Sequence, residues 1–408
     1  MPESGGLARG AALSAPSRIA LMYAAMFFIT GVSTPFLPIW LSERGISASD
    51  IGLLAILPQL LRSTCAPAVG LAADQHNTHR SLTIALSALG LMAWLLLSQV
   101  SGFWLALVAL VLIALSNTQS PLVESIAMAG VRSQGHDYGR MRLWGSAAYV
   151  AATLTAGWLA SRFGNASVIW LMLAGAAAAL AVSLLLPQPN STDENLARLP
   201  VSTIAAPPQQ LTWASAHALL RLPVMAPLLL ASGALQGAHG MYYTYGTLHW
   251  QSLGLDRRWF GVLWAIGLVT EIALFWWSKR AVQALSGPGL ILCGAVLSVL
   301  RWGAMAFDPP LALLVPLQML HGLTFGCSHL GAMHVLAKIS PSDRMATSQA
   351  LYSLVSTLGI VLATAVSAEL YPMTGGHAYL AMAIMAAGGL WAAATVQRGL
   401  PQSVGEVR

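Results

Sequence analysis

Residues 166–186 read ASVIWLMLAGAAAALAVSLLL, and the residues that follow, 187–222, read PQPNSTDENLARLPVSTIAAPPQQLTWASAHALLRL. The first stretch carries no charged side chain and has the length, about 20 residues, that a membrane-spanning helix needs. The second stretch combines prolines with Asn, Ser, Thr, Asp and Glu, which ends an apolar helix. It is the only long polar stretch in the chain, so it marks a boundary between two apolar halves.

Apolar segments of spanning length lie on both sides of this boundary. In the first half we predict spans at 18–41, 50–73, 81–99, 103–128, 139–161 and 166–186. In the second half we predict spans at 223–249, 259–278, 288–307, 310–337, 344–371 and 376–397. Six spans, a central loop and six more spans are typical of transporters built from two related halves. We therefore predict an all-α membrane protein with twelve transmembrane helices in two six-helix bundles, residues 1–186 and 223–408, joined by a cytoplasmic linker loop, 187–222.

The composition supports a membrane protein. Hydrophobic residues make up 56% of the 408 residues and charged residues only 8%, whereas soluble domains contain about 25% charged residues. The net charge of +6 does not indicate a nucleic-acid-binding protein, because the basic residues occur singly at the ends of apolar runs rather than in one patch. We expect lipid and a small-molecule substrate as partners, and a protein that functions as a monomer.

The distribution of Lys and Arg predicts the orientation. If the N-terminus is cytoplasmic, most basic residues lie on the cytoplasmic side: Arg9, Arg18, Arg80, Arg132, Arg140, Arg142, Arg198, Arg221, Lys279, Arg280, Lys338, Arg344, Arg398 and Arg408. The outer side carries Arg44, Arg162, Arg257, Arg258 and Arg301, and only Arg62 falls well inside a span. Basic loops stay inside. We expect both termini in the cytoplasm and the chain in the inner membrane of a bacterium, with no cleaved signal peptide.

The sequence offers no motif for catalysis or for ATP hydrolysis. Neither Lys279 nor Lys338 completes a phosphate-binding GxxxxGK[ST] motif, and no HExxH or GxSxG occurs. His321 and His329 are eight residues apart with no carboxylate neighbour, which argues against a metal site. We therefore expect no enzyme activity, no metal and no cofactor. Two functions remain possible for the chain: transport driven by an ion gradient, and a passive pore.

Polar residues inside the first-half spans are candidates for substrate binding. Glu124 lies near the inner end of one predicted span, and Arg142 lies a few residues into the next, so the two can meet at similar depth. Asn117 shares a helical stripe with Glu124. Two interpretations stay open: the two residues form a structural latch between helices, or Arg142 receives an anionic or hydroxylated substrate.

In the second half, Glu271 lies deep in a span with no Lys or Arg within a helical turn. A carboxyl group there is costly to ionise, so Glu271 is a candidate proton carrier. Further polar side chains on neighbouring spans are Arg301, the stripe of His321 and His329, and the stripe of Gln236, His239 and Tyr243. Each histidine alone is also consistent with an ordinary interhelical hydrogen bond.

At these residues the chain resembles a known family. The run DYGRMRLWGS, 137–146, resembles the helix 4–5 segment of the major facilitator branch that contains lactose permease and the phenylpropionate transporters. LQGAHGMYY at 235–243, RWG at 301–303 and LHGLTFGCSH at 320–329 look most like the 3-phenylpropionate permease group. The resemblance implies alternating access and proton symport. It also implies that Glu124 and Arg142 contact substrate, and that Glu271, Arg301 and His321 occupy positions similar to coupling and binding groups.

The chain departs from the family in three places. The gating-loop signature between helices 2 and 3 survives only as Gly70, Asp74 and Arg80. Helix 10 has no acidic residue between Pro310 and Lys338, which directs proton coupling to Glu271 on helix 8. The glycine-proline motif of drug antiporters is missing from helix 5, which favours uptake over export.

The sequence therefore predicts proton-coupled uptake of a small aromatic carboxylate such as an arylpropionate. The alternative within the same class is symport of a sugar or a nucleoside, because a glutamate–arginine pair also binds hydroxyl groups. A membrane-embedded enzyme using His239 or His321 as a base would need a clustered nucleophile or metal set, which the sequence lacks. A passive pore gives no reason for an unpaired Glu271 inside a span.

Overall fold

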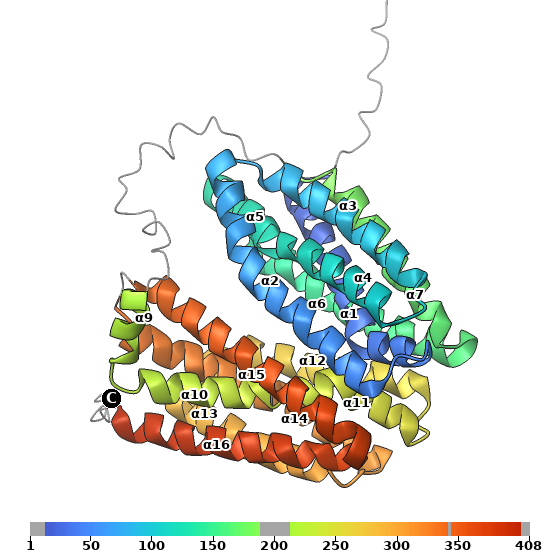
Figure 1. The fold of residues 1–408 in the computed structure, drawn as a ribbon. Helices are drawn as coiled ribbons and strands as arrows, with labels where there is room; N and C mark the ends of the chain where they lie inside the picture. The colour runs from blue at the N-terminus through green and yellow to red at the C-terminus, as the bar shows by residue number, and fades with distance from the viewer. Residues whose placement is uncertain (1–12, 188–212, 342–343, 401–408) are drawn as a thin grey trace, which may run out of the picture.

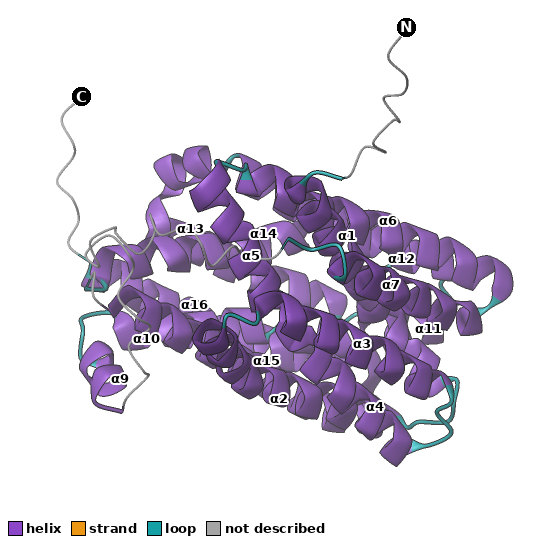
Figure 2. Cartoon of the chain, turned by 90° about the horizontal axis from the view of Figure 1, so that it is seen from above, coloured by secondary structure: helices purple, strands orange, loops and turns teal. Residues whose placement is uncertain are grey.

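The structure is a computed structural model that describes residues 13–187, 213–341 and 344–400. All regular elements in this part of the chain are helices (Figure 2). The first half contains α1 (Ala15–Ser42), α2 (Ala48–His76), α3 (His79–Ser98), α4 (Phe103–Ser116), the 3₁₀ helix η1 (Asn117–Gln119), α5 (Ser120–Gln134), α6 (Tyr138–Phe163), the 3₁₀ helix η2 (Asn165–Ser167) and α7 (Val168–Ser183). The second half contains α9 (Trp213–Leu220), α10 (Met225–Gly237), α11 (Gly240–Ser252), α12 (Arg257–Trp276), α13 (Ser278–Met305), α14 (Leu311–Ile339), α15 (Met345–Thr374), the 3₁₀ helix η4 (Gly375–Ala378) and α16 (Tyr379–Gly399).

Nine stretches of the described helices are long and apolar enough to cross a membrane, which confirms an all-α multi-pass membrane protein. One of them, Thr347–Gly399, contains both α15 and α16. The nine do not include α6, whose first turns carry Arg140 and Arg142, nor the pair α10 and α11, which are 13 residues each. These less apolar helices contribute side chains to the interior of the molecule, as described below.

The helices form two groups that meet along one side (Figure 1). Helices α1–α7 lie together at the upper right of the view, and α9–α16 lie together at the lower left. Extensive helix–helix packing joins the groups through α6 with α12, α2 with α15 and α1 with α11. Of the predicted linker loop, residues 188–212 lie outside the described residues, while Trp213–Leu220 is the helix α9.

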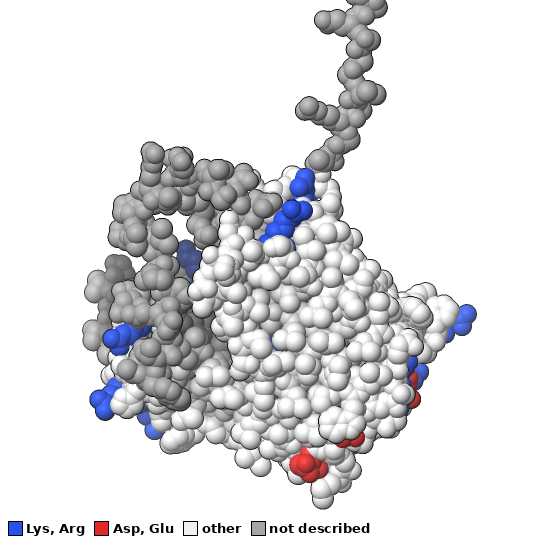
Figure 3. All heavy atoms as spheres, turned by 45° about the horizontal axis from the view of Figure 1, so that its top comes forward, with Lys and Arg blue, Asp and Glu red and all other residues white. Residues whose placement is uncertain are grey.

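Large apolar side chains cover the outer surface. Trp104, Trp158, Trp391 and Ile384 are each at least 60% exposed, which suits contact with lipid and not with water. In Figure 3 charged side chains lie mainly near the edges of a broad uncharged face. The apolar core, by contrast, runs continuously through both groups of helices.

Two helices are interrupted where the sequence predicts single spans. The predicted span 103–128 is α4, the 3₁₀ turn η1 and α5, with Pro121 in the first turn of α5. Proline lacks a backbone N–H, so it fits where a new helix begins. The predicted span 223–249 is α10 and α11, which are separated at Ala238 and His239. Interrupted helices are typical of transporter binding sites, because they expose backbone groups near the middle of the membrane.

One predicted boundary is displaced by ten residues. The span predicted at 288–307 begins as α13 at Ser278, because a first segment continues through a kink at Ser286, whose φ is 59° and ψ is 170°. Pro288, two residues after Ser286, has no backbone N–H to donate to the preceding turn. The apolar criterion missed this segment, because Lys279, Arg280 and Gln283 make it polar.

Candidate functional site

A cavity of about 700 Å³ lies between the two groups of helices. Helices α1–α6 with the 3₁₀ turn η1 line it from the first half, and α11, α12, α14 and α15 line it from the second. Slightly more than half of the lining residues are apolar, and the polar ones are Thr30, Ser33, Thr34, Gln59, Arg62, Asn117, Ser120, Ser146, Tyr149, Tyr243, Thr244, Glu271, His321 and Thr364. A concave site that combines apolar walls with polar groups is typical of small-molecule binding.

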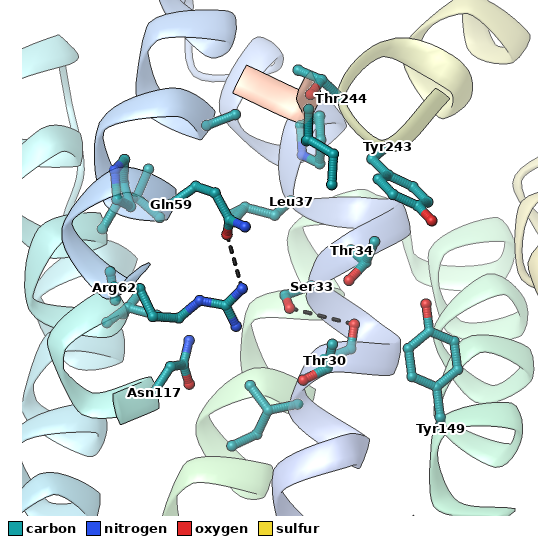
Figure 4. Close-up of a pocket in the computed structure, with 18 of the residues that line it drawn as sticks. Thr30, Ser33, Thr34, Leu37, Gln59, Arg62, Asn117, Tyr149, Tyr243 and Thr244 are labelled. Carbon is teal, nitrogen blue, oxygen red and sulfur yellow. Dashed lines mark hydrogen bonds between the residues drawn. The ribbon is translucent and has the colours of Figure 1, made fainter. Parts of the chain in front are cut away.

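Arg62 enters the cavity from α2 (Figure 4). Its Nη2 donates a hydrogen bond to Gln59 Oε1 at 3.0 Å, and Asn117 of η1 lines the same cavity. In the described part of the chain Arg62 has no carboxylate within ion-pair distance. A guanidinium has five N–H donors, so most of them remain available to a ligand or to water.

Aromatic side chains form the opposite side of the cavity. Tyr149 of α6 and Tyr243 of α11 lie across from Arg62 in Figure 4, and Trp264 of α12 also lines the cavity. The rings of Tyr243 and Trp264 have centroids 6.0 Å apart, and Trp264 stacks on Tyr242 at 4.5 Å. These packed rings offer a rigid face to an aromatic substrate.

Glu271 reaches the cavity from α12. Among the described residues its carboxyl group has no hydrogen-bond or ion-pair partner, although the positive charge of Arg142 acts on it from α6. Its backbone packs closely against Gly322 of α14, where a Cβ atom would collide with the Glu271 N atom. The carboxyl group is therefore held on a rigid helix with its oxygen atoms free to bind a proton.

Arg301 lies behind His321 and does not line the cavity. It is 0% exposed and donates to His321 Nδ1 at 3.2 Å, Gln318 Oε1 at 3.1 Å and Thr324 Oγ1 at 3.3 Å. Its guanidinium carbon also lies 4.2 Å from the ring centroid of Trp302. Because arginine can only donate, His321 Nδ1 accepts, and the neutral ring carries its proton on Nε2. Arg301 thereby orients His321 as a hydrogen-bond donor.

The other predicted polar residues of the second half bond within that half. Gln236 donates to Ser328 Oγ at 3.1 Å, and His239 contacts the Leu235 carbonyl at 3.0 Å and Thr324 Oγ1 at 3.3 Å. His329 Nδ1 lies 2.7 Å from the hydroxyl of Tyr352. Neither Gln236, His239 nor His329 is among the described residues lining the cavity, and their contacts fit interhelical hydrogen bonds. Their binding and coupling roles stay predictions.

Glu124 and Arg142 meet through an aromatic side chain. Tyr23 of α1 donates to Glu124 Oε2 at 2.6 Å, and the Arg142 guanidinium lies 5.5 Å from the Tyr23 ring centroid. Arg142 also lies 4.0 Å from the ring centroid of Phe27, which lines the cavity. No ion pair joins Glu124 to Arg142 in the described chain, and neither lines this cavity. This geometry leaves both the latch and the binding role open.

The predicted gating residues lie at the ends of α2 and α3. Asp74 Oδ1 lies 2.9 Å from His79 Nε2, and Arg80 Nη2 donates to the Leu184 carbonyl at 2.7 Å. Arg80 therefore ties the start of α3 to the residue after α7. These contacts stay within the first group of helices, and the gating role stays a prediction.

The two groups are bonded to each other at one end. Across this end, Ser49 Oγ donates to the Ala368 carbonyl (3.2 Å), Tyr245 OH to the Ala48 carbonyl (2.8 Å), Thr247 Oγ1 to the Pro35 carbonyl (2.6 Å), and Arg257 Nη2 and Gln251 Nε2 to Glu43 Oε1 (2.8 and 3.4 Å). These bonds join α1, α2 and the turn between them to α11, α12 and α15. At the opposite end the groups diverge (Figure 1).

Comparison with known proteins finds a family of membrane transporters, in agreement with a cavity between two groups of helices. The profile of the family described as the MFS_1 like family matches residues 17–381. The chain belongs to this family. It is 31% identical over 379 residues to the "Probable 3-phenylpropionic acid transporter" of Escherichia coli (strain K12), which covers 90% of this chain and 94% of that one. It is 27% identical over 337 residues to the maltose permease of Geobacillus stearothermophilus, which covers 82% of each chain.

Solved structures share the fold. The nucleoside transporter NupG superimposes with a TM-score of 0.76 at 17% identity, covering 96% of this chain and all of that one. A bacterial homologue of the lysosomal transporter Spinster, in an inward-facing and unoccupied conformation, gives a TM-score of 0.71 at 14% identity and covers 96% of this chain and 98% of that one. The predicted major facilitator fold is confirmed, and this MFS_1-like protein is a secondary transporter and not an enzyme.

Sequence reasoning assigned no role to Arg62 or Gln59. Arg62 stood out only as the one basic residue well inside a span. The signal was present, since Gln59 and Arg62 are three residues apart and share one face of α2. Thr30, Ser33 and Thr34 form a similar polar stripe on α1, and only the structure shows that the two stripes face one cavity.

Proposed function

We propose that this MFS_1-like protein is a proton-coupled symporter that takes up a small aromatic carboxylate through the inner membrane of a bacterium. The observation that carries the proposal is Glu271, a carboxyl group with no described hydrogen-bond partner, facing a cavity with aromatic walls and one arginine. The relative named as a probable 3-phenylpropionic acid transporter supports the same substrate class. The proton needs no further cofactor, and a single chain encloses the whole cavity.

The proposal includes twelve transmembrane helices. Besides the nine apolar stretches, α6 and the pair α10–α11 have spanning length, and α15 and α16 count separately. Alternation of these helices brings the start of α1 and the end of α16 to the same end of the molecule. Basic residues gather at that end, which by the positive-inside rule is cytoplasmic. The described members are Arg18, Arg80, Arg140, Arg142, Arg221, Lys279, Arg280, Lys338, Arg344 and Arg398.

This orientation makes the bonded end periplasmic and the diverging end cytoplasmic. The structure is then an inward-facing state, in which substrate leaves the cavity toward the cytoplasm. Alternating access requires that the bonds of Glu43, Ala48 and Pro35 to the second group break when the protein faces outward. The cavity between the groups, with the two-bundle division of the chain, supports a site that both bundles expose in turn.

Proton coupling requires that Glu271 binds a proton outside and releases it inside. The variant Glu271→Gln mimics the permanently protonated state with little change in shape. We expect it to bind substrate and to exchange labelled for unlabelled substrate in proteoliposomes. It fails at uphill accumulation driven by a pH gradient, because the empty carrier cannot return without a proton. Glu369→Gln, at the outer end of α15 and away from the cavity lining, is the matched control and keeps both activities.

Loss of both exchange and accumulation with normal folding would assign Glu271 to substrate binding. Full retention of both would remove it from the coupling mechanism.

A sugar or nucleoside is the second candidate substrate. It is favoured by the hydroxyl and amide groups of Thr30, Thr34, Gln59 and Asn117 in the cavity, and by the maltose permease relative. Competition of uptake by arylpropionates, by maltose or by nucleosides distinguishes the two classes.

A further inference from the structure

The cavity between the bundles contains one arginine. Among the described side chains that line it, Arg62 is the only Arg or Lys, and Glu271 is the only Asp or Glu. No ion pair joins Arg62 to Glu271 in the described part of the chain, although both side chains line the cavity. A charged side chain inside a membrane span is costly unless a partner or water compensates it. An anionic ligand would therefore compensate the charge of Arg62.

The surroundings of Arg62 suit a planar anion. Gln59 accepts one guanidinium hydrogen bond, which fixes the orientation of the side chain and leaves further N–H groups directed into the cavity (Figure 4). Asn117 lines the same cavity, and its amide can donate to the same ligand. A guanidinium binds a carboxylate through two parallel hydrogen bonds, which neither a hydroxyl group nor an amide carbonyl can form.

The far wall suits an apolar ring. Tyr149 and Tyr243 face Arg62 across the cavity, and Trp264 stands beside Tyr243. A ligand with a carboxylate at one end and an aromatic ring at the other spans these two walls. A ligand covered with hydroxyl groups would leave the apolar walls in contact with polar atoms.

We propose that Arg62, supported by Gln59 and Asn117, is the receptor for the carboxylate of an aromatic acid, with the ring bound toward Tyr149 and Tyr243. The proposal rests on the symport function proposed above and names the group that recognises the substrate. It assigns this role to Arg62 rather than to Arg142, because the Arg142 guanidinium packs on the rings of Phe27 and Tyr23 and does not line the cavity.

The two charges then explain how substrate and proton travel together. When Glu271 is protonated, the cavity has the single positive charge of Arg62, and a monoanion neutralises it. When Glu271 loses its proton to the cytoplasm, its negative charge lowers the positive charge that Arg62 in the cavity and Arg142 beside it present to the bound anion, and so disfavours that anion. Proton release and substrate release are therefore linked through electrostatics.

The test compares an acid with an uncharged analogue. Binding of 3-phenylpropionate, 3-phenylpropanamide and hexanoate to the purified full chain is measured by calorimetry. Wild type is expected to prefer 3-phenylpropionate to its amide. In Arg62→Gln the acid binds about 10- to 100-fold more weakly while binding of the amide falls much less, because the charge-assisted contact is lost only to the acid. Arg62→Lys keeps the positive charge but cannot form two parallel hydrogen bonds to a carboxylate, so its affinity for 3-phenylpropionate should lie between those of wild type and Arg62→Gln.

Arg162→Gln is the matched control, since this exposed arginine at the far end of α6 removes the same charge away from the cavity. It keeps the wild-type preference. The melting temperature of each unliganded variant checks that folding is intact.

Loss of the acid preference in Arg142→Gln, with Arg62→Gln unchanged, would overturn the proposal and return the role to Arg142. Equal binding of acid and amide by wild type would also overturn it. Binding of hexanoate as strong as that of 3-phenylpropionate, still dependent on Arg62, would reject the aromatic substrate of the proposed function but retain Arg62 as the carboxylate receptor.

Discussion

Arg62 and Arg301 are both arginines inside membrane-spanning helices, but their surroundings differ. Arg301 in α13 is fully buried, donates to His321, Gln318 and Thr324, and packs on the ring of Trp302. Arg62 in α2 enters the cavity and has one hydrogen bond, to Gln59. The protein itself supplies three acceptors to the Arg301 guanidinium, although its buried Nε has none, whereas it supplies only one to that of Arg62. A charged side chain in a membrane-spanning helix therefore indicates a binding function only when the protein itself leaves most of its hydrogen-bonding groups without a partner.

The comparison extends to charged groups at the surface. Arg257 forms an ion pair with Glu43, and both side chains are 32% exposed. Asp256 at the N-terminus of α12 is more exposed still. When a substitution removes one partner of an ion pair, water can solvate the remaining charge if it is exposed. The free-energy change caused by a substitution should therefore decrease from Arg301 to the pair of Arg257 and then to Asp256.

The largest effect is expected for Arg301→Gln. It leaves the buried acceptors on His321 and Gln318 without their charged donor, and it opens space beneath the ring of Trp302. We expect the free energy of unfolding to fall by about 3–5 kcal/mol, measured by thermal or denaturant unfolding in detergent. Arg62→Gln is the matched variant and changes it by less than about 0.5 kcal/mol. If Arg301→Gln and Arg62→Gln lower the free energy of unfolding equally, Arg301 has no greater structural role than Arg62.

A smaller effect is expected for Glu43→Gln at the bonded end. It breaks the ion pair to Arg257 and favours opening of this end by about 0.5–1 kcal/mol. The measurement is the labelling rate of a cysteine that replaces Ser49, in a background with Cys65, Cys293 and Cys327 changed to serine. The rate should rise about threefold, in line with that free energy.

The double variant Glu43→Arg with Arg257→Glu restores the pair with its charges exchanged. It should return labelling of the Ser49→Cys site to the slower rate. If Glu43→Gln does not change the labelling rate of the Ser49→Cys site, the ion pair does not hold this end closed.

The smallest effect is expected at Asp256. The backbone N–H of Arg258 donates to its carboxylate at 2.9 Å, and this hydrogen bond lowers the pKa of Asp256 below its usual value. Because the folded pKa is depressed, the stabilising contribution is present above the unfolded pKa, about 3.9. It is lost as the pH falls through the lower, folded pKa. Wild type should lose slightly more stability than Asp256→Asn between about pH 5 and pH 3, measured by melting temperature. An identical pH profile in the two proteins would contradict this.

Fold prediction succeeded where the physics is local. A run such as 166–186 must be helical in a membrane, because lipid offers its backbone no hydrogen-bond partner. It failed at the break near His239 and at the start of α13. There, packing of Gly240 against the Ile360 carbonyl and the kink at Ser286 depend on helices distant in sequence or on special backbone geometry.

The structure brings only some of the predicted site residues to the cavity, and their roles stay predictions. Glu271 and Tyr243 line the cavity, and His321 lines it with Arg301 bonded behind it. The sequence singled out Arg142 because it lies inside a predicted span at a depth similar to that of Glu124, but it could not show that Phe27 and Tyr23 occupy the guanidinium face. It gave Arg62 no role, because spacing along α2 does not reveal which face meets the second bundle.

The sequence by itself determined that the chain is a helical membrane protein and where most of its helices run. Hydrophobic length and the placement of charges act on each segment separately, so they can be read residue by residue. Only the tertiary structure decided which polar groups have partners and which face the cavity. Arg301 and Arg62 look alike along the chain, since each is one cation in an apolar run. What distinguishes them is the set of side chains that folding brings within hydrogen-bond distance.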